Sequence, residues 1–354
     1  MVDSLDAARP RAPGDAGPRP AGRRAWLGGA LAAAIGLLVP ACGAPAPAPR
    51  PPPPLPPLRT GDLAELLPLA GLRWLVLARP REIAAIPWLI PSIARIAPEP
   101  NLDRYAASTG VDLRQLHQAA VASYAGGATL YLARHGGDPV TIERRFRARL
   151  TGKVRRVAER PDLVRVSGDL GPTPHALALL GRDVLALQDG GSPSRGPARV
   201  ASLYALGKLS RSPTALAAEP LRGLAARFGP APALALALGP FEGDLARGAR
   251  GLLAGATAIG AAARPSAREK IAVAVAVAGD FSTSGPAASE ELLAAWNDLA
   301  LGSFGHLLGL DAPVEPPLAT HAPDAVAIAV ELDPDRLARG LAAATGARVE
   351  EIMR

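Results

Sequence analysis

The chain has 354 residues, of which 49% are hydrophobic but only 4% aromatic, so its core must be built mainly from Ala, Leu and Val. A single cysteine excludes any disulfide within the chain, and stability therefore has to come from packing. The formal net charge of +7 is a mild excess for a whole protein and is carried almost entirely by Arg.

The N-terminal segment has the three-part layout of an export signal. Arg23 and Arg24 precede an uncharged apolar run, residues 25–41, which ends in small residues. The run is shorter than the about 20 residues that a membrane-spanning helix needs. Residues 1–41 are therefore predicted to be a signal peptide that is removed. Outside the cytoplasm nucleic acid is not expected as a partner, whereas anionic lipid or polysaccharide is compatible with this charge.

Cys42 directly follows Val39-Pro40-Ala41 at the end of this run. Together with Gly43, this stretch resembles the lipobox of bacterial lipoproteins, although Pro40 departs from the small or hydroxylated residue usual there. The resemblance implies a diacylglyceryl group on the Cys42 thiol, cleavage before Cys42, and acylation of the new amino terminus, typically by palmitate. By analogy with enteric lipoproteins, Gly43 favours the outer membrane. We expect a lipid-anchored protein of the cell envelope, at the outer membrane or the periplasmic face.

Two alternatives to lipidation remain open. Cleavage by ordinary signal peptidase after Ala44-Pro45-Ala46 would release a free secreted protein, and an uncleaved anchor would leave Cys42 inert. Residues 22–27 also resemble a twin-arginine export signal, which would carry the body across the membrane already folded. An ordinary n-region that happens to contain two arginines is the other interpretation of the pair.

A proline-rich stretch separates Cys42 from the rest of the chain. Residues 44–58 read APAPAPRPPPPLPPL and are predicted to form a polyproline II spacer. At about 3.1 Å per residue, the spacer would hold the body roughly 40 to 45 Å from the lipidated end. We therefore divide the chain into a signal (1–41), a lipidated cysteine with its tether (42–58), and a body in two halves (59–212 and 213–354).

The body repeats one unit, in which a short apolar strand runs into a turn with Pro or Asp and then into a helix. The strands of these units are predicted at residues 72–78, 128–133, 233–238 and 325–332. Asp138 and Asp333 stand where a helix N-cap is expected, each followed by Pro at the first helical position. The two aspartates are therefore interpreted as caps rather than catalytic groups.

The remaining elements follow from changes in periodicity. Short runs between turn signals predict an antiparallel meander over residues 153–188, and a helix follows over 198–209. The second half is predicted to add a strand at 271–278 and helices at 245–263, 289–308 and 334–344. The expected fold is α+β, with two related halves, each a largely antiparallel sheet with helices packed on one face.

The motifs of common catalytic and cofactor sites are missing from the sequence. It contains no GxGxxG after a strand, no GxxxxGK[ST] and no GxSxG, and none of its five histidines pairs with another at i+3 or i+4. His135 and His321 are predicted at equivalent ends of two strands and are interpreted as solvent-exposed loop residues. No catalytic, cofactor-binding or metal-binding residue is assigned, and an enzyme is disfavoured.

A basic run is the charged feature that exceeds the background. Residues 144–160 contain many arginines, with Glu159 as the acidic residue among them. We interpret Arg144, Arg147 and Arg155 as candidates for a patch that rests on an anionic surface, where each charge contributes about 1 kcal/mol. A solvated helix and hairpin is the alternative interpretation.

The body as a whole has a general similarity to lipoproteins of G+C-rich soil bacteria that have no assigned activity. The similarity rests on the helix around Trp296 and the closing Leu332-Asp333-Pro334 turn, and it supplies no catalytic residue. The leading hypothesis is a non-enzymatic envelope lipoprotein that binds an envelope protein or an apolar ligand. One alternative is an exported hydrolase, with a histidine near a carboxylate and a hydroxyl. The other is a lipid carrier, with an aliphatic cavity between sheet and helices.

Overall fold

The computed structural model describes residues 55–352, without the side chains of residues 244–245 and 345–352. The predicted signal peptide, Cys42 and most of the predicted tether lie outside the described residues. Within the described part, no helix has both the length and the apolar character that crossing a bilayer requires.

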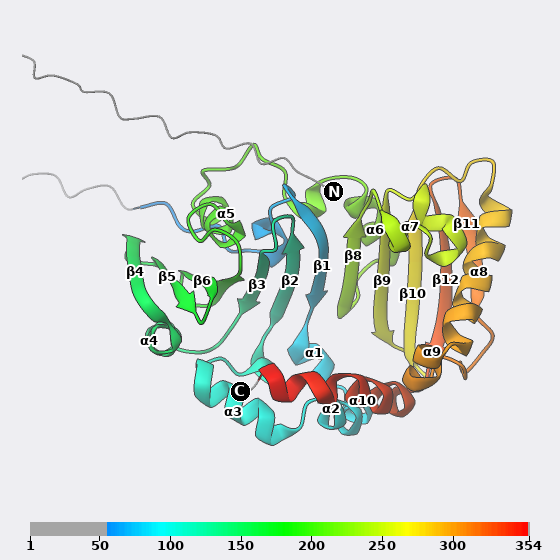
Figure 1. The fold of residues 1–354 in the computed structure, drawn as a ribbon, viewed down its shortest axis with the longest axis horizontal. Helices are drawn as coiled ribbons and strands as arrows, with labels where there is room; N and C mark the ends of the chain where they lie inside the picture. Colours follow the sequence, from blue (N-terminus) through cyan, green and yellow to red (C-terminus); the bar gives the residue numbers. More distant parts are fainter. Residues whose placement is uncertain (1–54, 353–354) are drawn as a thin grey trace, which may run out of the picture. The chain divides into compact units, whose positions relative to one another are not determined.

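One sheet of twelve strands organises the body, and all of its neighbouring strands pair antiparallel (Figure 1). The strand order is β11-β12-β10-β9-β8-β1-β2-β3-β7-β6-β5-β4. The strands are β1 (Leu72–Ala78), β2 (Gln118–Tyr124), β3 (Thr129–Arg134), β4 (Thr151–Arg160), β5 (Leu163–Leu170), β6 (Thr173–Leu180), β7 (Val184–Asp189), β8 (Ala233–Leu238), β9 (Ala258–Pro265), β10 (Ile271–Ala278), β11 (Leu318–Ala322) and β12 (Ala325–Leu332). With its helices, the body has the predicted α+β class, and its sheet is antiparallel as expected.

The two halves of the chain meet at the centre of the sheet, where β1 pairs with β8. The two halves share a topology. In each half the first strand pairs with the second, the second pairs with the third, and a later strand pairs with the other side of the third. This later strand is β7, beside β3, in the first half and β12, beside β10, in the second. The relation expected between the halves is therefore visible as a shared topology within one continuous sheet.

The helices connect the strands and cover parts of both faces of the sheet, rather than one face of each half as expected. They are α1 (Pro80–Ala84), α2 (Ile90–Ile96), α3 (Glu99–Thr109), α4 (Pro139–Arg149), α5 (Pro197–Ala205), α6 (Leu221–Phe228), α7 (Gly243–Ala246), α8 (Gly285–Leu301), α9 (Ser303–Leu308) and α10 (Pro334–Ile352). Asp138 accepts hydrogen bonds from two amides in the first turn of α4, and Asp333 does the same at the start of α10. Both predicted N-caps are confirmed.

Alternate residues along each strand point to opposite faces of the sheet, so the core is divided between the two faces. On the first face, one cluster packs α5 and α6 against the middle of the sheet, around the buried side chains of Leu75 and Leu236. On the second face there are two separate clusters. One lies under α8 around Trp296 and Ile328, and the other lies under α4 around Ile142. The second face is thus packed at its two ends.

The helix predicted over residues 245–263 is wrong. Only its start falls in α7, a 3-10 turn follows at Ala249–Ala254, and the residues from Ala258 form β9. Runs of Ala and Gly fit either a helical or a strand period, and pairing with β8 and β10 on both sides makes this one a strand. Gly260 is required there, because a Cβ would lie 2.7 Å from atoms of both Leu236 and Phe228, where α6 packs on the sheet.

Other boundaries differ less. The helix predicted over residues 289–308 starts earlier, at Gly285, and is broken at Gly302 into α8 and α9. The 3-10 turns at Leu63–Leu66 and Pro87–Leu89 were not expected, nor were the helices α2, α3 and α6 or the strands β2 and β11. Residues 55–58, assigned to the tether, already touch the body: Arg160 Nη1 donates to the Pro56 carbonyl at 2.8 Å. Contact with the body therefore starts before residue 59.

Candidate functional site

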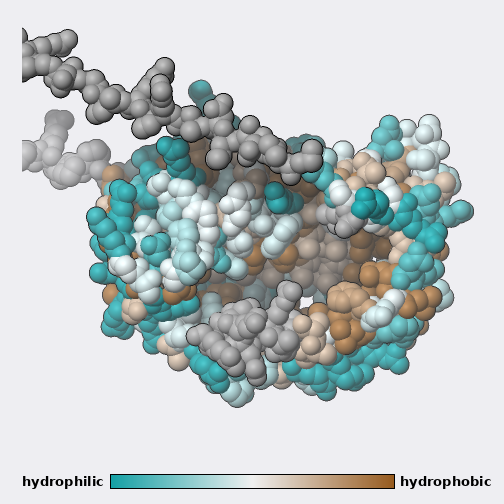
Figure 2. Space-filling model, viewed as in Figure 1, coloured by the Kyte–Doolittle hydropathy of each residue, from teal (hydrophilic) through white to brown (hydrophobic). Residues whose placement is uncertain are grey.

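The middle of the second face of the sheet is uncovered between its α4 end and its α8 end. There an open hollow of about 330 Å³ lies over β1, β8, β9 and β10. Figure 2 shows the hollow with hydrophobic residues on its floor. Its lining residues carry no charge and, apart from an indole N–H, no polar side-chain group: Trp74, Leu75, Val76, Ala235, Leu236, Ala237, Ile259, Gly260, Ala261 and Val275. We call this surface the apolar trough.

The strand register explains why the trough is continuous. Val76 of β1 is paired with Ala235 of β8, Ala235 with Ala261 of β9, and Ala261 with Val275 of β10. Residues that are paired across neighbouring strands point to the same face. The alanines keep the floor low, while Trp74 on β1 rises from it and remains 40% exposed.

The same row continues beyond the trough on its other side. Val76 is paired with Val121 of β2, and Val121 with Tyr131 of β3, which is 39% exposed. From β3 to β10 the row crosses six neighbouring strands in the sheet order, a span of about 24 Å at about 4.8 Å per strand. The exposed apolar surface is therefore long and narrow, and it runs across the strands.

The backbone beneath the trough is not available to hydrogen-bond a ligand. β1, β8, β9 and β10 each have a neighbouring strand on both sides, so their N–H and C=O groups are engaged in the sheet. A peptide cannot add to these strands as a further strand, because that mode needs an unpaired edge. Contact with this surface is therefore made through apolar side chains.

Comparison with known proteins gives one distant structural match. No protein-family model matches the chain, and no curated protein matches its sequence. Among solved structures, a chain titled "Structure of crystal form IV of TP0453" matches with 9% sequence identity and a TM-score of 0.44. The match covers 77% of this chain and 94% of that chain. The function has to be argued from the residues themselves.

The histidines in the described residues do not form the constellation that the hydrolase hypothesis requires. His175 Nε2 lies 3.2 Å from Asp189 Oδ1, and His306 Nδ1 lies 3.0 Å from Asp311 Oδ2. Neither histidine is hydrogen-bonded to a side-chain hydroxyl, so no nucleophile is activated at either pair. Within the described part of the chain there is also no group of three side chains suited to hold a metal ion.

The prediction that His135 is a solvent-exposed loop residue is wrong. His135 is 4% exposed, and its Nδ1 lies 3.1 Å from the Gly137 carbonyl oxygen. Its backbone N–H donates to the Asp183 carbonyl, which holds the residue against the turn between β6 and β7. His321 is exposed as predicted, but it belongs to strand β11 rather than to a loop.

Burial of His135 has a consequence for stability, because desolvation lowers the pKa of its imidazole. The unfolded chain then takes up a proton that the folded protein excludes, and stability is lost as the pH falls below about 6.5. We expect the free energy of unfolding to fall between about pH 8 and pH 5, and His135→Gln to remove part of this fall.

Urea unfolding at a series of pH values measures this slope. The same change at the exposed His321 is the matched control and should leave the slope as in the wild type. The chosen range stays above the titration of Asp112, Asp138 and Asp333, whose pKa values are lowered by hydrogen bonds. An unchanged slope in His135→Gln would contradict the prediction.

A polar hollow of about 440 Å³ lies at the ends of β1, β2 and β3. Its charges are engaged with one another: Arg79 with Glu82, and Arg134 with Asp183. Arg134 also donates to the carbonyls of Thr60 and Gly61. The charged side chains that line this hollow therefore have partners within the protein.

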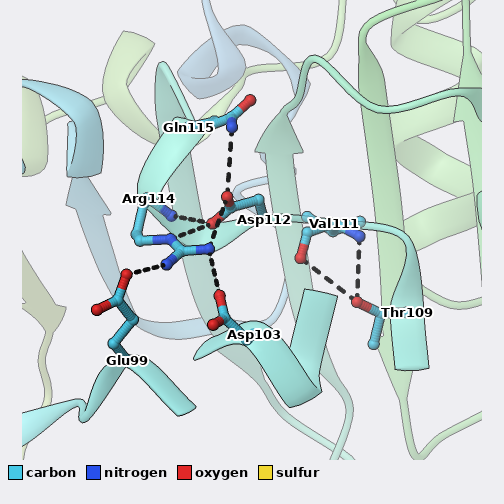
Figure 3. A network of polar contacts seen from close by, with 7 residues as sticks. All are labelled: Glu99, Asp103, Thr109, Val111, Asp112, Arg114 and Gln115. Carbon is cyan, nitrogen blue, oxygen red and sulfur yellow. Dashed lines mark hydrogen bonds and ion pairs between the residues drawn. The ribbon is translucent and has the colours of Figure 1, made fainter. Parts of the chain in front are cut away.

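Arg114 is likewise paired with neighbouring carboxylates (Figure 3). Its guanidinium donates to Asp112 at 2.9 Å and to Asp103 at 2.8 Å, and it lies 3.5 Å from Glu99. The hydrogen bond from Arg114 lowers the pKa of the Asp112 carboxyl. The network joins α3 to the 3-10 turn Leu113–Gln115, and three carboxylates already surround this cation. It is therefore not a site for an anionic ligand.

The three arginines predicted to form one patch are not brought together. Arg144 is exposed on α4, and Arg147 on the same helix lies 3.7 Å from Glu143. Arg156 of β4 also reaches Glu143, at 2.7 Å. The preceding residue of the strand, Arg155, therefore points to the opposite face. A basic run in sequence is divided here by the alternation of a strand. Cys42, the predicted lipidation site, lies outside the described residues.

Proposed function

We propose that this chain is a lipoprotein anchored in the cell envelope through Cys42, with a non-enzymatic role, and that its body binds an apolar chain in the trough. The observation that carries the ligand proposal is the unbroken row of apolar side chains across β3, β2, β1, β8, β9 and β10. Exposed apolar surface of this extent commonly marks a binding site.

The shape of the trough favours an acyl chain. A narrow apolar strip of about 24 Å suits a linear ligand, and its hollow is within the range of about 300 to 1,000 Å³ found for small-molecule sites. The side chains of the lining have no hydrogen-bond acceptor and a single donor, so binding there is driven by the removal of methylene groups from water. Each buried methylene contributes about 0.8 kcal/mol before the cost of ordering the chain.

The predicted anchor supports the same ligand. A body tethered through Cys42 would remain at a membrane, where acyl chains are abundant, and the proline-rich tether would let it stand away from the surface. A protein partner is the weaker candidate, because protein interfaces combine apolar contacts with direct hydrogen bonds and the lining of the trough has no polar side-chain group apart from the Trp74 indole N–H.

Photolabelling tests this proposal. Membranes that contain the full-length protein are incubated with a photoactivatable fatty acid and irradiated, and labelled peptides are identified by mass spectrometry. We expect label on β1, β8 and β9. Ala261→Arg should reduce the label at least tenfold, since it places a charge in the row where an acyl chain would otherwise contact apolar side chains only.

Val140→Arg is the matched control, because it introduces the same charge at a valine of α4 that is 71% exposed and lies away from the trough. Circular dichroism confirms that both variants are folded. Equal labelling of Ala261→Arg and the wild type, or label distributed without preference over the surface, would rule out acyl-chain binding in the trough.

A further inference from the structure

A second hollow, of about 350 Å³, lies on the first face of the sheet, away from the apolar trough. Its floor is formed by β4, β5 and β6, and the loop at Pro193 and Ser194 and the first turn of α5 stand over it. Three arginines line it from three different elements: Arg155 from β4, Arg165 from β5 and Arg199 from α5. We call it the arginine hollow.

Strand register builds the arginine hollow. Arg155 is paired with Ser167, and Ser167 with Ala176, in one row. In the adjacent row, Arg165 is paired with Ala178. The small side chains on β6 leave space in front of the two long guanidinium groups, and the Ser167 hydroxyl has no hydrogen-bond partner in the described residues.

Charge in the hollow is only partly balanced. Glu159 Oε1 accepts from Arg165 Nε at 2.8 Å and also from Arg199 Nη1. Arg155 has no ion pair or hydrogen bond within the described part of the chain. Two of the three guanidinium groups therefore share one carboxylate, and the third has none.

Two of the three arginines are partly shielded from solvent. The side chains of Arg165 and Arg199 are 21% and 27% exposed, so water screens their repulsion less than at an open surface, whereas Arg155 is exposed. Arg199 also lies in the first turn of α5, where the helix dipole adds a partial positive charge. An anion of about two charges would offset this excess.

We propose that the arginine hollow binds a phosphoryl group. A phosphate monoester carries about 1.5 to 2 negative charges near neutral pH, which matches the balance of three arginines and one glutamate. The planar guanidinium pairs with phosphate oxygens through two parallel N–H···O bonds, and the Ser167 hydroxyl is placed to donate another. The phosphoryl group belongs either to a dissolved ester or to a lipid headgroup. The site lies on the opposite face from the trough and does not rest on acyl-chain binding.

Calorimetric titration of the full-length protein in an uncharged detergent, with glycerol 1-phosphate as the probe, tests the dissolved form. Flotation with phosphatidylcholine vesicles that contain phosphatidic acid, compared with phosphatidylcholine alone, tests the headgroup. We expect saturable binding to at least one probe. Arg155→Gln should weaken it about tenfold or more, since one charge-assisted pair is lost. The probe that binds identifies the source of the phosphoryl group.

Arg155→Gln removes no contact within the described protein, so its fold is expected to be unchanged. Arg144→Gln, on the other face, removes the same charge at an exposed position and should bind as the wild type does. Arg199→Gln is a second variant, with its thermal stability measured in parallel. The proposal is overturned if neither probe binds saturably, if Arg155→Gln binds as tightly as the wild type, or if Arg144→Gln weakens binding equally.

Discussion

Replacement of Gln188 by Leu is expected to lower the free energy of unfolding by about 3 kcal/mol or more. Gln188 is fully buried on β7. Its Nε2 donates to the carbonyls of Gly190, at 2.8 Å, and Ser192, at 3.3 Å, while its Oε1 accepts from the Ala198 amide at 3.3 Å. Leu fills a similar volume but leaves three backbone groups without this partner, each at a cost of about 1 to 3 kcal/mol where water cannot replace it.

The loop held by Gln188 has no room to rearrange. A Cβ on Gly196 would lie 2.2 Å from Gln188 Oε1, so the backbone of the loop packs directly on the amide. The same loop stands over the arginine hollow through Ser194. Gln188→Leu should therefore also weaken phosphate binding.

Urea unfolding followed by circular dichroism measures the loss of stability. Gln115→Leu is the matched control: Gln115 is exposed, and its side chain makes one long hydrogen bond, 3.3 Å, to Asp112. Its effect should stay within about 0.5 kcal/mol. A similarly small effect for Gln188→Leu would mean that the loop finds other hydrogen bonds.

The second large effect is expected from Cys42→Ser. Under the proposed lipidation, the wild-type amino terminus carries acyl chains and enters the detergent phase on phase separation, since several acyl chains together give stable membrane binding where one does not. A serine hydroxyl is not the nucleophile that the lipobox resemblance implies, so the variant should carry no acyl mass. Mass spectrometry of the N-terminal peptide, together with detergent partitioning, measures both results.

Ala44→Ser is the control for this experiment, because it alters a neighbouring residue and keeps the cysteine. It should remain lipidated. If the wild type and Cys42→Ser are both soluble and both begin after Ala46, the protein is secreted free and the anchor proposal fails. If both keep residues 1–41 and neither carries lipid, the segment is an uncleaved anchor.

The strands that could be predicted from the sequence are those with clear ends. The apolar runs at residues 72–78, 233–238 and 325–332 coincide with β1, β8 and β12, since Pro or Asp follows each run and no other period fits. The segment that became β9 is built from small residues that suit either period, and only its neighbours in the sheet decide its conformation.

Neither candidate site could be predicted in the same way. The trough requires Val76, Ala235 and Ala261 to lie in one row, which depends on the pairing of strands far apart in the sequence. For the arginine hollow, part of the information was present in the sequence. In a strand Arg155 and Arg156 must point to opposite faces, so a basic run that spans a helix and a strand cannot form one patch. Arg199 comes from a helix that no local pattern connects to β4.

The two outer strands of the sheet have a consequence under the proposed anchoring at a membrane. Tethering confines neighbouring copies to two dimensions and raises the frequency with which sheet margins meet, and an unpaired margin is a template for joining sheets. At one margin, β4 carries Lys153, Arg155, Arg156 and Arg160. Pairing of two such strands would place positive charges opposite one another, which is destabilising. At the other, β11 has only five residues. Crowding at a membrane should therefore leave neighbouring copies separate rather than fused into a fibre.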